Sequence, residues 1–302
     1  MLTRPRPLAK LLEAIDDHER LVLLGDTLEM QETDPRDSIH VAEPVLRTLA
    51  ARLGKNKQLL LVPGNHDHNL VHDWAVAQGE RLSTAQQVPA NASKTLNLVL
   101  SWLAETRVEV HYPGVWLSDR IWATHGHYLA NYLSPMSSWG LHRGGEVTET
   151  VPAELEYPSP PPPPPSCVPD GLPPERWLDR RIPARIAPLT ARLLGHQMLH
   201  HSLPAFAASV RALAVNADWV VFGHVHRRGP RPGDDPKRWL AGPGGPALLN
   251  TGSWRYEPVV ARGLDGRSAY WPGGAVTIGP DGVPHSIGLL DGMTEAELLQ
   301  RP

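Results

Sequence analysis

Short apolar runs alternate along the chain with amphipathic stretches. The runs predict strands at 21–24, 59–62 and 219–222, because four consecutive apolar residues suit strands that are buried on both faces. Apolar positions three and four residues apart predict helices at 8–18, 41–53, 96–103, 185–194 and 205–215. Further strands are expected at 108–111 and 115–124, paired around Tyr112-Pro113-Gly114, and at 247–249, 275–278 and 286–287. Strands that alternate with helices indicate an α/β protein.

Residues 152–174 interrupt this pattern. They hold 11 of the 32 prolines, six of them consecutive at 160–165. Such a segment cannot form a backbone ladder, and it adopts polyproline II or no fixed structure. We interpret it as a spacer in preference to a ligand for an SH3-type domain.

Composition narrows the classes of function. With 302 residues, 41% of them hydrophobic, the chain can bury a sizeable core, and a net charge of −3 argues against a dedicated nucleic-acid binder. The single cysteine, Cys167, excludes an intrachain disulfide and a cysteine-rich zinc site, and it fits a cytoplasmic location. No run approaches the roughly 20 apolar residues of a membrane span. Because the chain has only one cysteine, any bound metal is expected on carboxylates and on some of the 15 histidines.

Four polar motifs each follow a predicted strand. They are Gly25-Asp26, Gly64-Asn65-His66-Asp67, His125-Gly126-His127 and Gly223-His224-Val225-His226. The carboxyl ends of strands form the edge where open α/β sheets bind ligands. Asp, Asn and His supply oxygen and nitrogen ligands for Mn, Fe, Zn or Co. Two such ions about 3.5–4 Å apart are a common device for hydrolysing phosphate esters, and Asp26 is the natural bridging carboxylate.

These motifs resemble those of the calcineurin-like metallophosphoesterases. The family pattern is D-x-H, G-D, G-N-H-D/E, H-G and G-H-x-H, and the last four blocks occur here in that order between about Leu21 and Trp254. Asn250-Thr251-Gly252-Ser253-Trp254 resembles the strand and turn that follow G-H-x-H. The resemblance implies a four-layer α/β/β/α sandwich of two mixed sheets in a single domain, 1–302. Residues 131–200 lie outside the resemblance and would form an inserted helical and Pro-rich cap over the metal edge.

The resemblance also implies a role for each motif residue. Asp26 would bridge two divalent ions, Mn or Fe with Zn or Ni as alternatives. Asn65, His125 and His224 would complete the second ion's ligands, and His226 would bind the first. His66 would act beside the scissile phosphate as a proton donor or transition-state stabiliser, with Asp67 holding its ring. The implied activity is phosphoester hydrolysis by metal-bound hydroxide.

The D-x-H block of the family is absent, together with the first strand that would carry it. Asp16-Asp17-His18 matches the letters but lies at a predicted helix end, so we do not expect it to bind metal. Two interpretations remain open: a start codon assigned too late, or a degenerate first metal site. The second favours a catalytically impaired binding or scaffold protein as the alternative to a hydrolase.

Other histidines and arginines lie outside the family's ligand pattern. His127 could support the site or face solvent, His68 and His72 are expected on a surface helix, and His196 and His200 on a solvated helix face. An arginine group in the insertion could form a lid over an anionic substrate, although a solvated helix is the simpler interpretation; it comprises Arg176, Arg180, Arg181 and Arg185. Arg227, Arg228 and Arg231 follow His226 and should lie near the site.

Overall fold

The protein is described from a computed structural model, which covers residues 1–31, 33–79, 83–127, 183 and 185–300. The Pro-rich segment 152–174, Cys167 and most of the expected cap lie outside the described residues. The cap and the domain boundaries therefore stay predictions.

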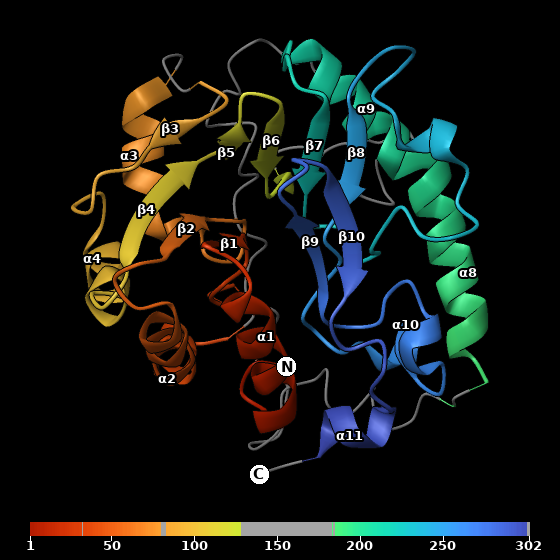
Figure 1. Ribbon diagram of the computed structural model, residues 1–302, viewed down its shortest axis with the longest axis horizontal. Coiled ribbons are helices and arrows are strands. Elements are labelled where there is room, and N and C mark those ends of the chain that lie inside the picture. Colours follow the sequence, from red (N-terminus) through yellow and green to blue (C-terminus); the bar gives the residue numbers. More distant parts are fainter. Residues whose placement is uncertain (32, 80–82, 128–182, 184, 301–302) are drawn as a thin grey trace, which may run out of the picture.

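Two four-stranded mixed sheets form the centre of the fold (Figure 1). The first contains β1 (Arg20–Leu24), β2 (Gln58–Val62), β3 (Gln86–Gln87) and β4 (Arg107–Tyr112), in the order β1-β2-β4-β3. Strands β1, β2 and β4 are parallel, and β3 is antiparallel to β4. The Asp26 and Asn65 motifs therefore leave the same edge of neighbouring strands.

The second sheet contains β5 (Gly114–Ser118), β6 (Ile121–Thr124), β7 (Trp219–Phe222) and β8 (Ala247–Asn250), in that order. Strands β6, β7 and β8 are parallel, and β5 is antiparallel to β6. The histidine motifs follow β6 and β7, again at one edge. A separate hairpin pairs β9 (Gly274–Ile278) with β10 (Pro284–Gly288).

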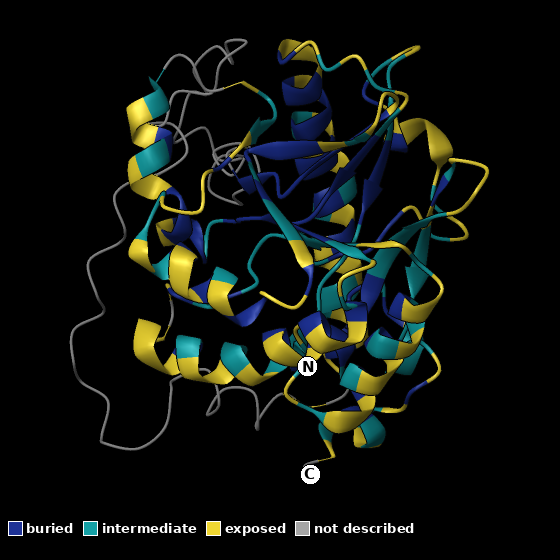
Figure 2. Ribbon diagram, turned by 60° about the vertical axis from the view of Figure 1, so that its left-hand side comes forward, coloured by how far each residue is buried: buried dark blue, intermediate teal, exposed yellow. Residues whose placement is uncertain are grey.

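Helices cover the outer faces of both sheets. The first sheet packs against α1 (Pro5–Asp16), α2 (Pro35–Leu53) and α4 (Lys94–Trp102), and the second packs against α9 (Leu203–Ala212). The remaining α-helices are α3 (His72–Gln78), α8 (Ala187–Gln197), α10 (Pro258–Ala261) and α11 (Glu295–Leu299). Figure 2 shows buried residues along the strands and exposed residues on the outer sides of the helices. No helix in the described part of the chain is both long and apolar enough to cross a membrane.

The alternation of side chains along β2 explains the layers. Leu59 and Leu61 are fully buried in the cluster that contains α1, α2 and α4. Leu60 and Val62 point the other way and pack in a cluster with Val115, Ile121 and Val221 of the second sheet. An apolar run without alternation thus lines two cores, and the predicted four-layer α/β/β/α sandwich is confirmed.

The expected strand pair around Tyr112-Pro113-Gly114 is wrong. Strand β4 belongs to the first sheet and β5 to the second, so these three residues carry the chain between layers. The run 115–124 is itself a hairpin of β5 and β6, and Asp119 and Arg120 form its turn. Local apolar patterning could not reveal which partner each strand takes.

Helix α2 and the pair formed by α8 and α9 also differ from their predicted extents. Helix α2 begins at Pro35 and not near Val41, because Asp34 caps it by accepting a hydrogen bond from the Arg36 N–H at 2.8 Å. Helices α8 and α9 are joined through a π-helical turn at Met198–Ser202 and are not separated by a loop. Pro204 lacks an N–H for the carbonyl of His200, which is consistent with the altered hydrogen bonding there.

Strand β1 is an edge strand of the described first sheet. Its four apolar residues, Leu21 to Leu24, are only half-buried, whereas the matching residues of β2 are buried.

Candidate functional site

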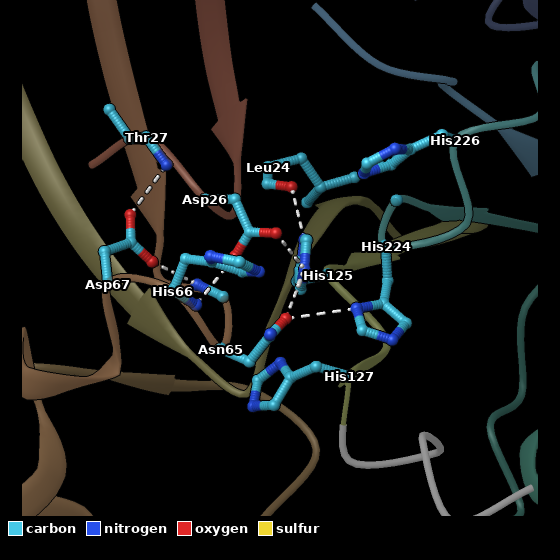
Figure 3. Close-up of polar contacts among 12 residues, drawn as sticks. Leu24, Asp26, Thr27, Asn65, His66, Asp67, His125, His127, His224 and His226 are labelled. Carbon is cyan, nitrogen blue, oxygen red and sulfur yellow. Dashed lines mark hydrogen bonds and ion pairs between the residues drawn. The ribbon is translucent and has the colours of Figure 1, made fainter. Parts of the chain in front are cut away.

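The motif residues meet where strands of both sheets end (Figure 3). Asp26 follows β1, Asn65 follows β2, His125 follows β6 and His224 follows β7. One ligand atom each from Asp26, His125 and His224 lies within 4.8 Å of the others. The Asn65 Oδ1 atom lies 3.2 Å from His125 Nε2 and 3.0 Å from His224 Nδ1. Sequence segments almost 200 residues apart therefore supply one compact polar cluster.

Tight backbone turns aim these side chains at one another. Asp26 and His224 have φ values of 51° and 61°, in the left-handed region that non-glycine residues rarely adopt. Gly25, with φ of 85°, precedes the first of these turns. Backbone strain of this kind persists only where the surrounding structure enforces it, and it concentrates at functional sites.

Asn250, at the end of β8, supports the second turn. Its Nδ2 donates to the carbonyl of Gly223 at 2.9 Å, and its Oδ1 accepts from the Gly252 N–H at 2.7 Å. Both the residue and these contacts are buried. The block Asn250 to Trp254 thus begins with a residue that fixes the backbone beside His224.

The hydrogen bonds of His125 indicate that the cluster suits a cation. His125 Nδ1 donates to the carbonyl of Leu24 at 2.9 Å, which leaves the lone pair of the neutral ring on Nε2. That Nε2 lies 3.2 Å from Asp26 Oδ2 and 3.2 Å from Asn65 Oδ1, and both oxygens are acceptors. Three lone-pair atoms that converge inside a protein need a proton or a metal ion among them.

The charge states show which of these groups are ready to bind an ion and which would first lose a proton. Burial alone would raise the pKa of Asp26, but His125 and His66 outweigh it and hold the pKa well below its ordinary value. Burial, aided by His125, lowers the pKa of His224 to about 3, so this ring is neutral at pH 7. Burial also opposes a charge on His125, but Asp26 outweighs it and raises the pKa. Asp26 is therefore ionised and His224 neutral, the states in which these groups bind metals, whereas a proton on His125 Nε2 would be released when an ion binds.

His66 is oriented by Glu29, not by Asp67 as expected. His66 Nδ1 lies 2.7 Å from Glu29 Oε1, in the loop after β1. The backbone N–H of His66 donates to Asp26 Oδ1 at 3.0 Å, so His66 is also tied to the Asp26 carboxylate. Sequence reasoning missed Glu29, because a single acidic residue three positions after Asp26 carries no pattern of its own.

Asp67 joins two turns instead. Its carboxylate accepts from the N–H groups of Thr27 at 2.7 Å and Gly64 at 2.6 Å, and more weakly from Leu28 at 3.3 Å. Complete burial, followed by the charge of Asp26, raises the pKa of Asp67 to about 6 despite these bonds. The expected role of Asp67 on the His66 ring is therefore corrected: Asp67 locks the Asp26 loop to the Asn65 loop.

His226 lies outside the group formed by Asn65, His125 and His224 (Figure 3). Its Nδ1 is 2.5 Å from Oε1 of Glu257, the residue that precedes α10. Burial would raise the pKa of Glu257, but the hydrogen bond and charge of His226 outweigh it and lower the pKa. Glu257 is a second functional candidate that the motifs did not reveal, since it lies 31 residues after its partner.

The other histidines near the site differ in how far they are buried. His127 is buried, with Nε2 3.3 Å from the hydroxyl of Tyr112, which places it beneath the site and not in solvent. His68 is also buried, so the expected surface position is wrong for it, whereas His72 is exposed. Burial lowers the pKa of His68 to about 3. His196 and His200 stack on the exposed side of their helix, as expected.

The arginines after His226 bind acidic partners within the fold. Arg227 makes two hydrogen bonds with Asp234, at 3.0 and 2.6 Å, and Arg228 contacts Asp291 at 2.5 Å. The side chain of Arg231 donates to the backbone carbonyl of Gly266 at 3.1 Å. These arginines follow His226 in the sequence, but their contacts show a role in holding the fold together. Asp16, of the letter match to D-x-H, pairs with Arg52 at the surface, away from the cluster.

Comparison with protein families agrees with the geometry. The sequence profile of the calcineurin-like phosphoesterases matches residues 4–228, which include all four motifs. The chain belongs to the calcineurin-like phosphoesterase family. Searches of curated proteins and of solved structures find no match. The profile match ends before Asn250 and Glu257.

A glycine at the centre of this phosphoesterase site gives a test of its packing. A Cβ at Gly64 would lie 2.7 Å from the backbone nitrogen of Asp26 and 2.7 Å from Cδ2 of His125. We expect Gly64→Ala to lower the free energy of unfolding by about 1–3 kcal/mol, as overpacking does, when measured by urea denaturation. Gly292→Ala is the control, because no atom lies within 4 Å of its added Cβ, and its effect should stay within about 0.5 kcal/mol. Equal effects of the two substitutions would contradict the tight packing.

Proposed function

We propose that this protein is a metal-dependent phosphoester hydrolase with a dinuclear site. The observation that carries the proposal is the convergence of the Asp26, Asn65 and His125 lone pairs beside neutral His224. In this proposal Asp26 would contribute to holding both ions, Asn65, His125 and His224 would hold one of them, and His226 would hold the other. Oxygen and imidazole ligands suit Mn or Fe, with Zn or Ni as alternatives.

The chain's own residues complete the reaction. When bound, the ions supply Lewis-acid chemistry that activates water and neutralises phosphate charge. With Glu29 accepting from Nδ1, the doubly protonated ring of His66 would donate its Nε2 proton to the leaving oxygen and return to neutral imidazole. Asp67 keeps the two loops that carry Asp26 and His66 in register. The oriented His66 supports a hydrolase, since a binding protein has no need of a leaving-group acid.

One observation favours a second candidate function. Asp26 and His226 are the only ligands proposed for the first ion, since Asp16 pairs with Arg52 at the surface. A calcineurin-like protein with one complete ion site could serve as a catalytically impaired binding or scaffold protein. The coding sequence upstream of the Met1 codon discriminates the two: an in-frame strand-like run ending in D-x-H favours the hydrolase, and a stop codon without such a run favours the alternative.

Activity is tested with a chromogenic phosphomonoester and a phosphodiester in the presence of added Mn²⁺. The proposal expects hydrolysis that EDTA abolishes and Mn²⁺ restores. We further propose a cytoplasmic location, which the single cysteine supports. Absence of hydrolysis by a chain that also carries an upstream D-x-H block would overturn the proposed activity.

A further inference from the structure

The His226–Glu257 pair has a geometry that the proposed reaction does not by itself require. Glu257 Oε1 lies 2.5 Å from His226 Nδ1, and both side chains are about one-third exposed, at 28% and 34%. An ionised carboxylate can only accept a hydrogen bond, so the ring must donate from Nδ1. The lone pair of neutral His226 is then confined to Nε2.

The backbone around Glu257 is fixed. The Glu257 carbonyl accepts from the N–H groups of Val260 at 3.1 Å and Ala261 at 3.0 Å, which closes the first turn of α10. Val260 and Ala261 are fully buried. The Glu257 side chain makes no capping hydrogen bond to this helix. The backbone that carries the Glu257 side chain is therefore fixed, and its carboxylate bonds His226 and not the helix.

We propose that Glu257 is a positioning residue, which accepts the Nδ1 proton of His226 and so presents Nε2 of that ring to the first ion. This inference rests on the proposed metal-dependent function. Carboxylates that accept from a metal-binding histidine fix its tautomer and orientation, and their loss weakens metal binding about 10–100-fold. Because Asp26 and His226 are the ligands proposed for the first ion, the orientation of His226 should affect its binding strongly. Glu257 lies beyond the region that the family profile matches.

The tautomer of His226 is tested without any metal. Histidine labelled with ¹⁵N reports both ring nitrogens by long-range ¹H–¹⁵N NMR at pH 8, and the His226→Gln variant assigns the signals. The full-length protein should show His226 protonated at Nδ1. In Glu257→Ala, which removes no helix cap, the ring should become a mixture of tautomers. Glu295→Ala is the matched control, because Glu295 is 26% exposed and pairs with Arg262, not with a histidine.

The same variants are then titrated with Mn²⁺ by calorimetry. Glu257→Ala should raise the dissociation constant of the His226-dependent equivalent about 10–100-fold and leave the other equivalent unchanged. Glu295→Ala should change neither. An unchanged His226 tautomer in Glu257→Ala would overturn the positioning role, as would unchanged Mn²⁺ affinity. If the wild-type protein bound no Mn²⁺ while the tautomer still depended on Glu257, the metal-dependent function would fail and the orientation of His226 by Glu257 would stand.

Discussion

Replacing Asn65 or His224 by alanine should lower kcat/KM for phosphoester hydrolysis by about 1,000-fold, or about 4 kcal/mol of transition-state stabilisation. Each substitution removes one of the atoms that meet beside His125 Nε2 and so opens the ion site that the structure presents most completely. The measurement is steady-state hydrolysis with added Mn²⁺, together with the Mn²⁺ content of the purified protein. Both quantities should fall together.

His196→Ala serves as the control, because this histidine is exposed on its helix and stacks only on His200. It should leave activity and metal content unchanged. Unchanged activity in both Asn65→Ala and His224→Ala would show that the assigned site is wrong. A loss of folding is excluded by comparing the circular dichroism spectra of the variants.

Replacing His66 by asparagine should lower kcat about 10²–10⁴-fold, the range typical for loss of a general acid. Glu29→Ala should cause part of this loss, because it frees the ring that Glu29 orients through Nδ1. The combined variant should be little worse than His66→Asn alone, since the two residues act as a unit. The loss should be greater for phenyl phosphate than for p-nitrophenyl phosphate, because a poorer leaving group needs its proton more.

A second carboxylate–histidine pair provides the control for Glu29. Glu109 lies 3.1 Å from His111 on β4, and neither residue is a proposed ligand or the proposed acid, so Glu109→Ala should leave kcat unchanged. Mn²⁺ content should stay at the wild-type level in all of these variants. Equal loss of rate for the two leaving groups would contradict proton donation by His66.

The sequence predicted the parts of the site that lie directly after strands. Asp26, Asn65, His125 and His224 follow apolar runs, and parallel strands bring their carboxyl ends together without further information. Glu29 and Glu257 escaped prediction for the opposite reason. Each lies in an irregular segment and reaches its histidine through the tertiary fold, so no periodicity or local motif marks it.

The sequence also could not predict which strands pair or which groups some side chains contact, because both depend on the tertiary fold. The alternation within β2 could not be seen, because a strand buried on both faces is apolar at every position. Tyr112-Pro113-Gly114 resembled a hairpin turn, although it connects two sheets. Asp67 follows His66 directly, yet successive residues point apart, and its carboxylate binds backbone N–H groups instead.

The candidate ligands come from both sheets, and this has a thermodynamic consequence. Asp26 and Asn65 belong to the strand ends of one layer, and His125 and His224 to those of the other. An ion held among them would cross-link the two layers, which also pack together through apolar side chains. Only the folded protein brings these ligands together, so ion binding would raise the free energy of unfolding. The increase is about 2.7 kcal/mol when the free ion is at 100 times its dissociation constant. Metal supply would then set the conformational stability of the protein as well as its proposed activity.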